Sequence, residues 1–200
     1  MEQLSHWITA ATLATVIISW IVFASAFLLR KRPPQTKDAV NAPKSWLGIV
    51  LQGVSYFPVW ALQRRPIFSP FIPGFYGMNI VLQVLAAGLA VGCVFLTIAA
   101  IRELGKQWSL EARLVEGHEL VTTGPYNLVR HPIYTAMLGK LIATGIVLSY
   151  WVVVPIAVFI FLVGTLIRIR FEERLLSDAF GERFTEWRSR VPGLIPFLKL

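Results

Sequence analysis

The chain has 200 residues, of which 56% are hydrophobic and only 15% are charged, and its mean hydropathy is +0.63. Soluble domains are about 45–50% apolar and about 25% charged, so this composition excludes an ordinary soluble domain. It indicates instead an all-α polytopic membrane protein, and we attribute the net charge of +8 to orientation in the membrane rather than to nucleic acid. The single cysteine, Cys93, excludes a disulfide framework and a cysteine metal cluster, and we predict no metal site.

Five apolar segments are predicted to cross the membrane, since a span needs roughly 20 mostly apolar residues. They are 7–29, 46–62, 78–101, 133–149 and 152–167. Only Ser149, Tyr150 and Trp151 separate the last two, which predicts a tight antiparallel hairpin. The proline- and glycine-rich stretch 64–77 predicts a bent, non-helical connection.

Basic residues predict the orientation of these spans. Sixteen Lys and Arg lie in the loops after the first and third segments and beyond the fifth, against two, Arg64 and Arg65, on the opposite side. The positive-inside rule then places the N-terminus outside and both the third loop and the C-terminal tail in the cytoplasm. We expect a multi-pass protein of a prokaryotic inner membrane or an ER-type membrane.

The chain is predicted to form a single membrane domain over 1–200. Residues 1–101 would be scaffold, and 102–200 would form the cofactor pocket from the third loop, the last two spans and the tail. In that tail, 171–191 has apolar residues at helical spacing, which predicts an amphipathic helix on the membrane or the protein, broken at Gly181.

Polar residues gather in two stretches, 105–134 and 168–190, which flank the predicted hairpin. The short hairpin should therefore bring them together. Arg130 and His131 precede Pro132 at a helix start, where free N–H groups favour an anion. Arg130 alone is also consistent with a membrane-interface marker, and His131 with an interfacial histidine.

Glu172 and Glu173 are unusual at the end of a span, because a helix C-terminus favours cations. They either pair with nearby arginines on a solvated face or bind a cation or a set of hydroxyls.

Together these stretches resemble the isoprenylcysteine carboxyl methyltransferase family and its phospholipid methyltransferase relatives, over roughly 101–197. The resemblance rests on motifs in one order along the chain: 104–109 (LGKQWS), 118–126 (HELVTTGPY), 130–134 (RHPIY), Glu172-Glu173, 180–184 (FGERF) and Val191-Pro192.

The resemblance implies a membrane methyltransferase that uses S-adenosyl-L-methionine on a lipidic acceptor, either an isoprenylcysteine-like carboxylate or a phospholipid amine. It suggests Arg130 and Glu172 as the catalytic pair that orients acceptor and donor. The implied cofactor-binding residues are Leu120, Val121, Gly124, Tyr126, His131, Pro132, Tyr134 and Glu173. No G-x-G-x-x-G stretch is present, so a nucleoside cofactor would lie in a pocket made by the hairpin, the third loop and the tail.

Two positions depart from the family pattern. Ala136 stands where a glycine is typical, and Phe171 and Arg174 shorten the glutamate run. Lys140, about two turns into the fourth span, is either a functional cation for an acidic headgroup or a lysine that snorkels to the interface.

Two other classes of function remain open. NADPH-dependent membrane sterol and enone reductases share an Arg-His-Pro-x-Tyr element, but they usually have Asn after the Pro and Gly-Glu after the Tyr. This chain has Ile133 and Thr135-Ala136 there, which favours methyl transfer. A non-catalytic scaffold or carrier is the other alternative, although the sequence indicates neither repeat-related halves nor broken helices near the bilayer midplane, and its polar residues gather on the cytoplasmic side.

Overall fold

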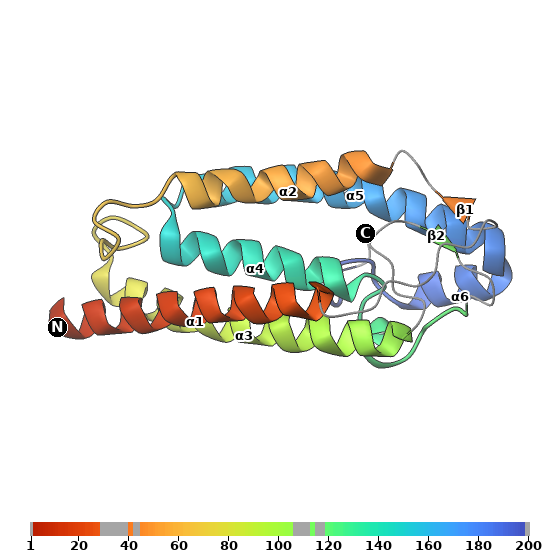
Figure 1. Ribbon diagram of the computed structural model, residues 1–200, viewed down its shortest axis with the longest axis horizontal. Helices are drawn as coiled ribbons and strands as arrows, with labels where there is room; N and C mark the ends of the chain where they lie inside the picture. The colour runs from red at the N-terminus through yellow and green to blue at the C-terminus, as the bar shows by residue number, and fades with distance from the viewer. Residues whose placement is uncertain (1, 29–39, 42–44, 106–112, 115–118, 199–200) are drawn as a thin grey trace.

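The structure is a computed structural model that describes residues 2–28, 40–41, 45–105, 113–114 and 119–198 (Figure 1). It is helical apart from one antiparallel pair of two-residue strands. The elements in chain order are α1 (Glu2–Leu28), β1 (Val40–Asn41), α2 (Trp46–Ala61), α3 (Tyr76–Leu104), β2 (Arg113–Leu114), the 3-10 helix η3 (Gly124–Asn127), α4 (Pro132–Leu148), α5 (Val153–Phe180) and α6 (Glu182–Arg190). The predicted all-α class is confirmed.

The five long helices form a bundle with α4 between two pairs. In Figure 1, α2 and α5 lie along one side of α4, and α1 and α3 lie along the other. The short helix α6 lies at one end of the bundle, which we call the α6 end, and the connection 62–75 lies at the opposite end.

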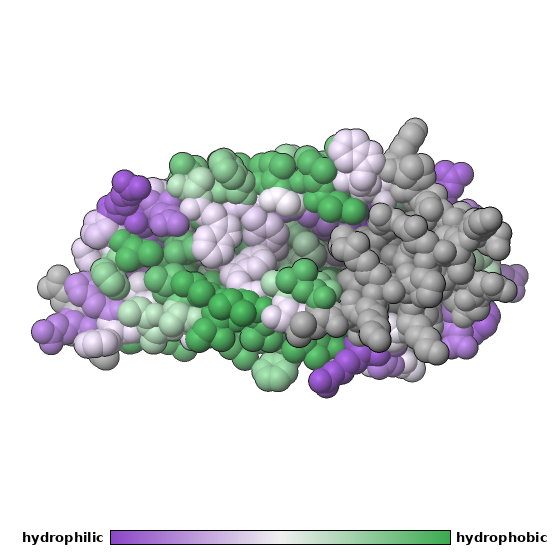
Figure 2. All heavy atoms as spheres, viewed as in Figure 1, coloured by the Kyte–Doolittle hydropathy of each residue, from purple (hydrophilic) through white to green (hydrophobic). Residues whose placement is uncertain are grey.

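The bundle has the apolar exterior of a membrane protein. Figure 2 shows apolar side chains along the helices and hydrophilic ones gathered toward the two ends. Three helices, α1, α3 and α5, are long and apolar enough to cross a membrane, whereas α2 and α4 are apolar but have only 16 and 17 residues. The prediction of a multi-pass membrane protein is confirmed.

The α4–α5 hairpin forms as predicted. Helix α4 ends at Leu148 and α5 begins at Val153, and the backbone N–H of Val153 donates to the carbonyl of Tyr150. Arg64, predicted only as a charge on the outer side, is buried and donates to the carbonyls of Ile146, Val147 and Ser149. It thereby satisfies carbonyls that the end of α4 leaves without intrahelical partners.

The tail segment 171–191 is helical and breaks at Gly181, as predicted, but its first part is not separate from the last span. Helix α5 runs without interruption to Phe180, and the part after Gly181 forms a second helix, α6. No glycine or proline occurs between 165 and 180, whereas Gly181 has a φ of +53°, a conformation that favours glycine. As a result, Glu172 and Glu173 lie on the same rigid helix as the last span.

Lys140 ties α4 to α1 inside the bundle. Its side chain is fully buried, and its ammonium donates to the hydroxyl of Ser19 and lies 4.5 Å from the ring centroid of Trp20. The indole of Trp20 in turn donates to Thr144, one turn along α4. Lys140 therefore does not snorkel to the interface. It connects α4 to α1 through a hydrogen bond and a cation–π contact.

Two glycines set the close approach of α2 and α5. A Cβ on Gly48 would lie 2.5 Å from Cγ of Arg168 and 2.6 Å from the carbonyl oxygen of Gly164. Small residues at such crossings let helix backbones pack directly in a membrane. The approach is reinforced by a hydrogen bond of 2.9 Å from the Gln52 side chain to the Thr165 hydroxyl.

We expect Gly48→Ala to destabilise the protein by about 1–3 kcal/mol, because the added methyl group would force α2 away from α5 and displace Arg168. Gly53→Ala is the matched control, since a Cβ there meets nothing within 4 Å. Thermal unfolding in detergent measures both variants. Equal melting temperatures for the two variants would show that the α2–α5 approach is not tightly packed.

Candidate functional site

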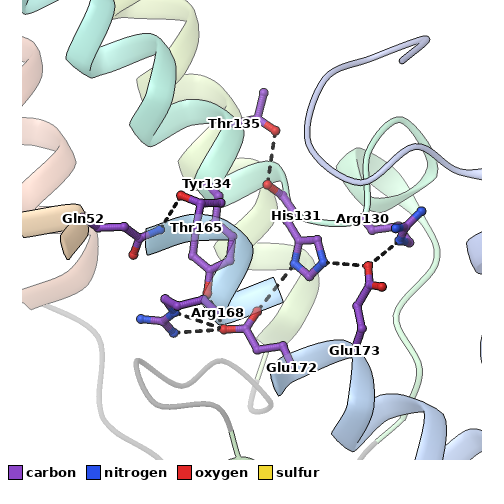
Figure 3. A network of polar contacts seen from close by, with 9 residues as sticks. All are labelled: Gln52, Arg130, His131, Tyr134, Thr135, Thr165, Arg168, Glu172 and Glu173. Carbon is purple, nitrogen blue, oxygen red and sulfur yellow. Dashed lines mark hydrogen bonds and ion pairs between the residues drawn. The ribbon is translucent and has the colours of Figure 1, made fainter. Parts of the chain in front are cut away.

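The hairpin brings the two polar stretches of the sequence together at the α6 end of the bundle. Arg130 and His131 precede the first turn of α4, and Tyr134 lies within that turn. Arg168, Glu172 and Glu173 lie on the facing part of α5 (Figure 3). These six side chains form one connected set, which we call the ionic network.

His131 is the centre of the ionic network. Its Nε2 lies 3.2 Å from Oε1 of Glu173, and its Nδ1 lies 3.5 Å from Oε2 of Glu172. Burial by itself lowers the pKa of His131, but hydrogen bonds and charge from Glu172 and Glu173 outweigh it and raise the pKa above the ordinary value of 6.5. The two carboxylates, which lie on either side of the ring, therefore favour its charged imidazolium form (Figure 3).

Arg130 binds Glu173 and the C-terminal segment. Its Nε donates to Oε1 of Glu173 at 2.7 Å, and its Nη1 donates to the carbonyls of Arg188 and Val191. The backbone N–H groups of Arg130 and His131 donate to the carbonyls of Pro192 and Gly193. Among the described residues, Arg130 and Glu172, predicted as a pair, have no direct contact and are connected through Glu173 and His131.

Glu172 is paired with Arg168, a residue to which the sequence analysis gave no role. Nη2 and Nε of Arg168 lie 3.0 and 3.3 Å from Oε1 of Glu172, and this oxygen also accepts a hydrogen bond from the Tyr134 hydroxyl. The guanidinium carbon of Arg168 lies 5.2 Å from the Tyr134 ring centroid. The spacing of four residues between Arg168 and Glu172 was the available signal, because it puts both on one face of a helix.

The ionic network is largely shielded from water. Arg168, Glu173 and His131 are 4%, 6% and 8% exposed, whereas the side chain of Glu172 keeps 21% of its surface. Glu173 also meets Arg188 on α6, at 3.2 Å, and that arginine is largely exposed. Since interactions between charges strengthen as water is excluded, these groups hold one another in a fixed geometry.

Three of the other predicted cofactor residues, Leu120, Val121 and Tyr126, lie in an adjoining group that we call the cap cluster. Its buried members are Ala100 of α3, Tyr126 of η3, Phe184 and Trp187 of α6, and Val191. Leu120 and Val121 pack against it and are partly buried. Burial raises the pKa of Tyr126, so its hydroxyl stays protonated.

Gly124 and Pro132 have structural roles. Gly124 has a φ of +56°, and a Cβ there would lie 3.1 Å from the carboxyl group of Glu103, which accepts a hydrogen bond from Thr123. Pro132 occupies the first position of α4, where it needs no hydrogen-bond partner. Both residues therefore fix the backbone that presents Tyr126, Arg130 and His131.

The indole N–H of Trp187 is a further feature that the sequence analysis did not identify. Trp187 is 6% exposed, and its Nε1 has no hydrogen-bond acceptor among the residues that the structure describes.

Among the described residues, no three His, Cys, Asp or Glu side chains are grouped so as to hold a metal ion.

Stability should depend on pH through His131. Because the folded-state pKa is raised, the contribution of His131 is complete below about pH 6.5 and is lost as the pH rises through the folded-state pKa. The melting temperature of the protein minus that of His131→Gln should therefore fall with rising pH. The control is His6→Gln, an exposed histidine that packs on Phe68 far from the network. A difference that is constant from pH 5 to pH 9 would contradict the charged state assigned to His131.

Comparison with known proteins identifies the part of the chain that contains this site. Residues 84–178 match the model of the isoprenylcysteine carboxyl methyltransferase (ICMT) family. The chain is 34% identical over 93 residues to protein-S-isoprenylcysteine O-methyltransferase B of Arabidopsis thaliana, covering 44% of this chain and 45% of the plant protein. The corresponding mouse protein-S-isoprenylcysteine O-methyltransferase is 36% identical over 86 residues, which cover 41% of this chain and 29% of the mouse protein.

A relative with a different name matches a longer stretch. The nickel-cobalt-cadmium resistance protein NccN of Alcaligenes xylosoxydans xylosoxydans is 34% identical over 118 residues, covering 58% of this chain and 53% of that protein. The chain thus spans about half the length of these relatives or less. The matched stretch contains α4, most of α5 and every residue of the ionic network. Through residues 84–178, the chain is similar to the isoprenylcysteine carboxyl methyltransferase family.

Proposed function

We propose that this protein is a membrane methyltransferase that uses S-adenosyl-L-methionine to methylate a lipid-borne acceptor. The observation that carries the proposal is the ionic network, in which paired charges and an aromatic hydroxyl are held in a largely water-free site at the end of a membrane hairpin. The similarity of residues 84–178 to a methyltransferase family supports the same reaction.

The residues present fit the chemistry of this donor. Its amino-acid end carries an ammonium and a carboxylate, which glutamate and arginine side chains bind. Its sulfonium is a cation, and aromatic rings such as those of Tyr126 and Tyr134 attract cations on their faces. Both tyrosines are buried beside the charged residues, Tyr134 within the ionic network and Tyr126 in the adjoining cap cluster. Bound there, S-adenosyl-L-methionine would supply an activated methyl group.

The charge balance of the ionic network favours an anionic acceptor. Three cations, Arg130, His131 and Arg168, meet two carboxylates, and Arg188 adds a fourth positive charge at the surface. This local excess stabilises a carboxylate more than an amine. Among the two acceptor classes that the sequence left open, we therefore infer a lipid-linked carboxylate, which needs no base because it is already a nucleophile.

Arg168 is better placed than Arg130 to hold that carboxylate. Arg130 already donates to a glutamate and two backbone carbonyls, so its role is to fix the C-terminal segment against α4. Arg168 lies on the side of α5 that faces α2, next to Glu172, the more exposed of the two glutamates. We assign Arg168 and Glu172 to orientation of acceptor and donor, and Arg130 to positioning.

These residues would accelerate the reaction mainly by orientation and exclusion of water. An acceptor oxygen would attack the methyl carbon of the donor in line, so that an oxygen–carbon bond forms as the carbon–sulfur bond breaks with its electrons left on sulfur. The products would be a methyl ester and S-adenosylhomocysteine, whose sulfur is neutral. No proton moves, so the fixed orientation of acceptor and donor matters most. Such orientation can lower the activation barrier by roughly 7–11 kcal/mol. Arg168 and Glu172 both lie on the single helix α5, which keeps their relative positions fixed.

The orientation and boundaries predicted from the sequence form part of the proposal. The surplus of basic residues supports a cytoplasmic α6 end and an external N-terminus. A lipid-borne acceptor would then reach the ionic network from the inner half of the bilayer. We retain the single domain over 1–200, with 102–200 carrying the cofactor pocket.

Methyl transfer should depend on the Arg168–Glu172 pair. Purified protein in liposomes, given methyl-labelled donor and membrane extract, should label a lipid-soluble carboxylate as a base-labile ester. Glu172→Gln and Arg168→Lys should each reduce the rate about a hundredfold or more, since the first removes a charge and the second removes the planar fork.

Arg170→Lys is the matched control on the same helix, because Arg170 is exposed and two residues away from Arg168. It should retain activity. Full activity in both network variants would remove the pair from the mechanism, and a label resistant to base would indicate an amine acceptor instead.

Ligand-induced stabilisation should separate the methyltransferase from the reductase-like alternative. S-adenosylhomocysteine at about 100 times its Kd should stabilise the protein by about 2.7 kcal/mol, and NADPH should not shift the melting temperature. The reverse pattern would favour a reductase.

A further inference from the structure

The cap cluster contains a buried hydrogen-bond donor that the described part of the chain leaves unpaired. Trp187 is 6% exposed on α6, and its indole N–H has no acceptor among the residues that the structure describes. A buried donor without a partner lowers stability, and native proteins rarely keep one without a reason. Its position therefore needs an explanation.

Trp187 lies next to the ionic network. The residue that follows it, Arg188, contributes a carbonyl to Arg130 and a guanidinium to Glu173. Tyr126 lies with Trp187 in the cap cluster, and its helix η3 directly precedes the segment that carries Arg130 and His131 into α4. A ligand whose charged end meets the ionic network can thus extend into the cap cluster.

The chemistry of the cap cluster suits a flat heterocycle rather than a second charged group. Its buried side chains are apolar or aromatic, and Phe184 and Trp187 pack edge to face with ring centroids 5.9 Å apart. An indole N–H can only donate, so its partner must be an acceptor. The purine of a nucleoside has an aromatic face and several ring nitrogens that accept hydrogen bonds.

We propose that Trp187 binds the nucleoside end of the methyl donor, with its indole N–H donating to an acceptor atom of the purine. The inference rests on the proposed function, because that function supplies a nucleoside. It assigns the two parts of the site to two ends of one ligand: the ionic network to the amino-acid end, and the cap cluster to the purine.

Calorimetric titration of the full chain in detergent with S-adenosylhomocysteine tests this assignment. Trp187→Phe should weaken binding about tenfold, as expected for one hydrogen bond in a buried site. Because phenylalanine is smaller, a second variant carries 3-benzothienylalanine at position 187, which keeps the shape of tryptophan and removes only the N–H group. Trp151→Phe is the control, since Trp151 lies in the α4–α5 link at the opposite end of the bundle.

The melting temperature without ligand supplies a second readout. The benzothienylalanine variant should be at least as stable as the unsubstituted protein, because it loses an unpaired donor, while its stabilisation by S-adenosylhomocysteine should be smaller. A lower melting temperature without ligand, together with unchanged affinity, would show that the N–H binds an acceptor of the chain itself and would overturn the proposal. An affinity for S-adenosylhomocysteine equal to that of the unsubstituted protein in both Trp187 variants would also overturn the proposal. If the unsubstituted protein fails to bind S-adenosylhomocysteine, the proposed function fails as well, so the two failures are distinguishable.

Discussion

The site depends on one electrostatic constraint: charges withdrawn from water must be paired. His131 satisfies this constraint for both glutamates by placing one ring nitrogen against each. Oε1 of Glu172 accepts hydrogen bonds from Arg168 and Tyr134. Arg130 shares Oε1 of Glu173 with His131, and Arg188 pairs with Oε2 of Glu173. Removing one member would leave another charge buried without a partner, so the network holds its members in a single arrangement. That arrangement is suited to binding a ligand that is itself charged at one end.

The helical hairpin makes this pairing possible. The four-residue link 149–152 forces α4 and α5 to run antiparallel, and the uninterrupted course of α5 to Phe180 extends the pair beyond the apolar region. The glutamates therefore face His131 from a continuous helix and not from a mobile tail. The C-terminal segment completes the structure, since the carbonyls of Pro192 and Gly193 receive the N–H groups of Arg130 and His131. These backbone bonds fix the start of α4 at the point where its charged residues lie.

The sequence predicted the bundle, the hairpin and the meeting of the two polar stretches, because span length and loop length are set by simple geometry. It did not predict which arginine pairs with which glutamate. Adjacent residues on a helix point about 100° apart, so Glu172 and Glu173 take different partners, and the choice depends on how α5 is rotated against α4. Arg168 and Trp187 were not assigned for a similar reason. An arginine at the end of a span is usually interpreted as a residue of the membrane interface. A tryptophan on an amphipathic helix is usually interpreted as a residue that packs in the core.

The scaffold helices also shape the site, although the family match begins only at residue 84. Gly48 of α2 lets that helix approach α5 so closely that a methyl group would collide with the side chain of Arg168. Gln52 lies one turn further along α2, and its side chain donates a hydrogen bond to Thr165, which lies about one turn before Arg168 on α5. Figure 3 shows Gln52 and Thr165 beside the ionic network. Helix α2 thus forms the wall behind the guanidinium group and restricts its conformation. If Arg168 holds an acceptor carboxylate, substitutions in α2 that keep the fold would change acceptor selectivity while leaving donor binding intact, because the cap cluster is built from α3, η3, α6 and the C-terminal segment. Helix α2 would then influence which acceptor binds, whereas the C-terminal elements would bind the donor.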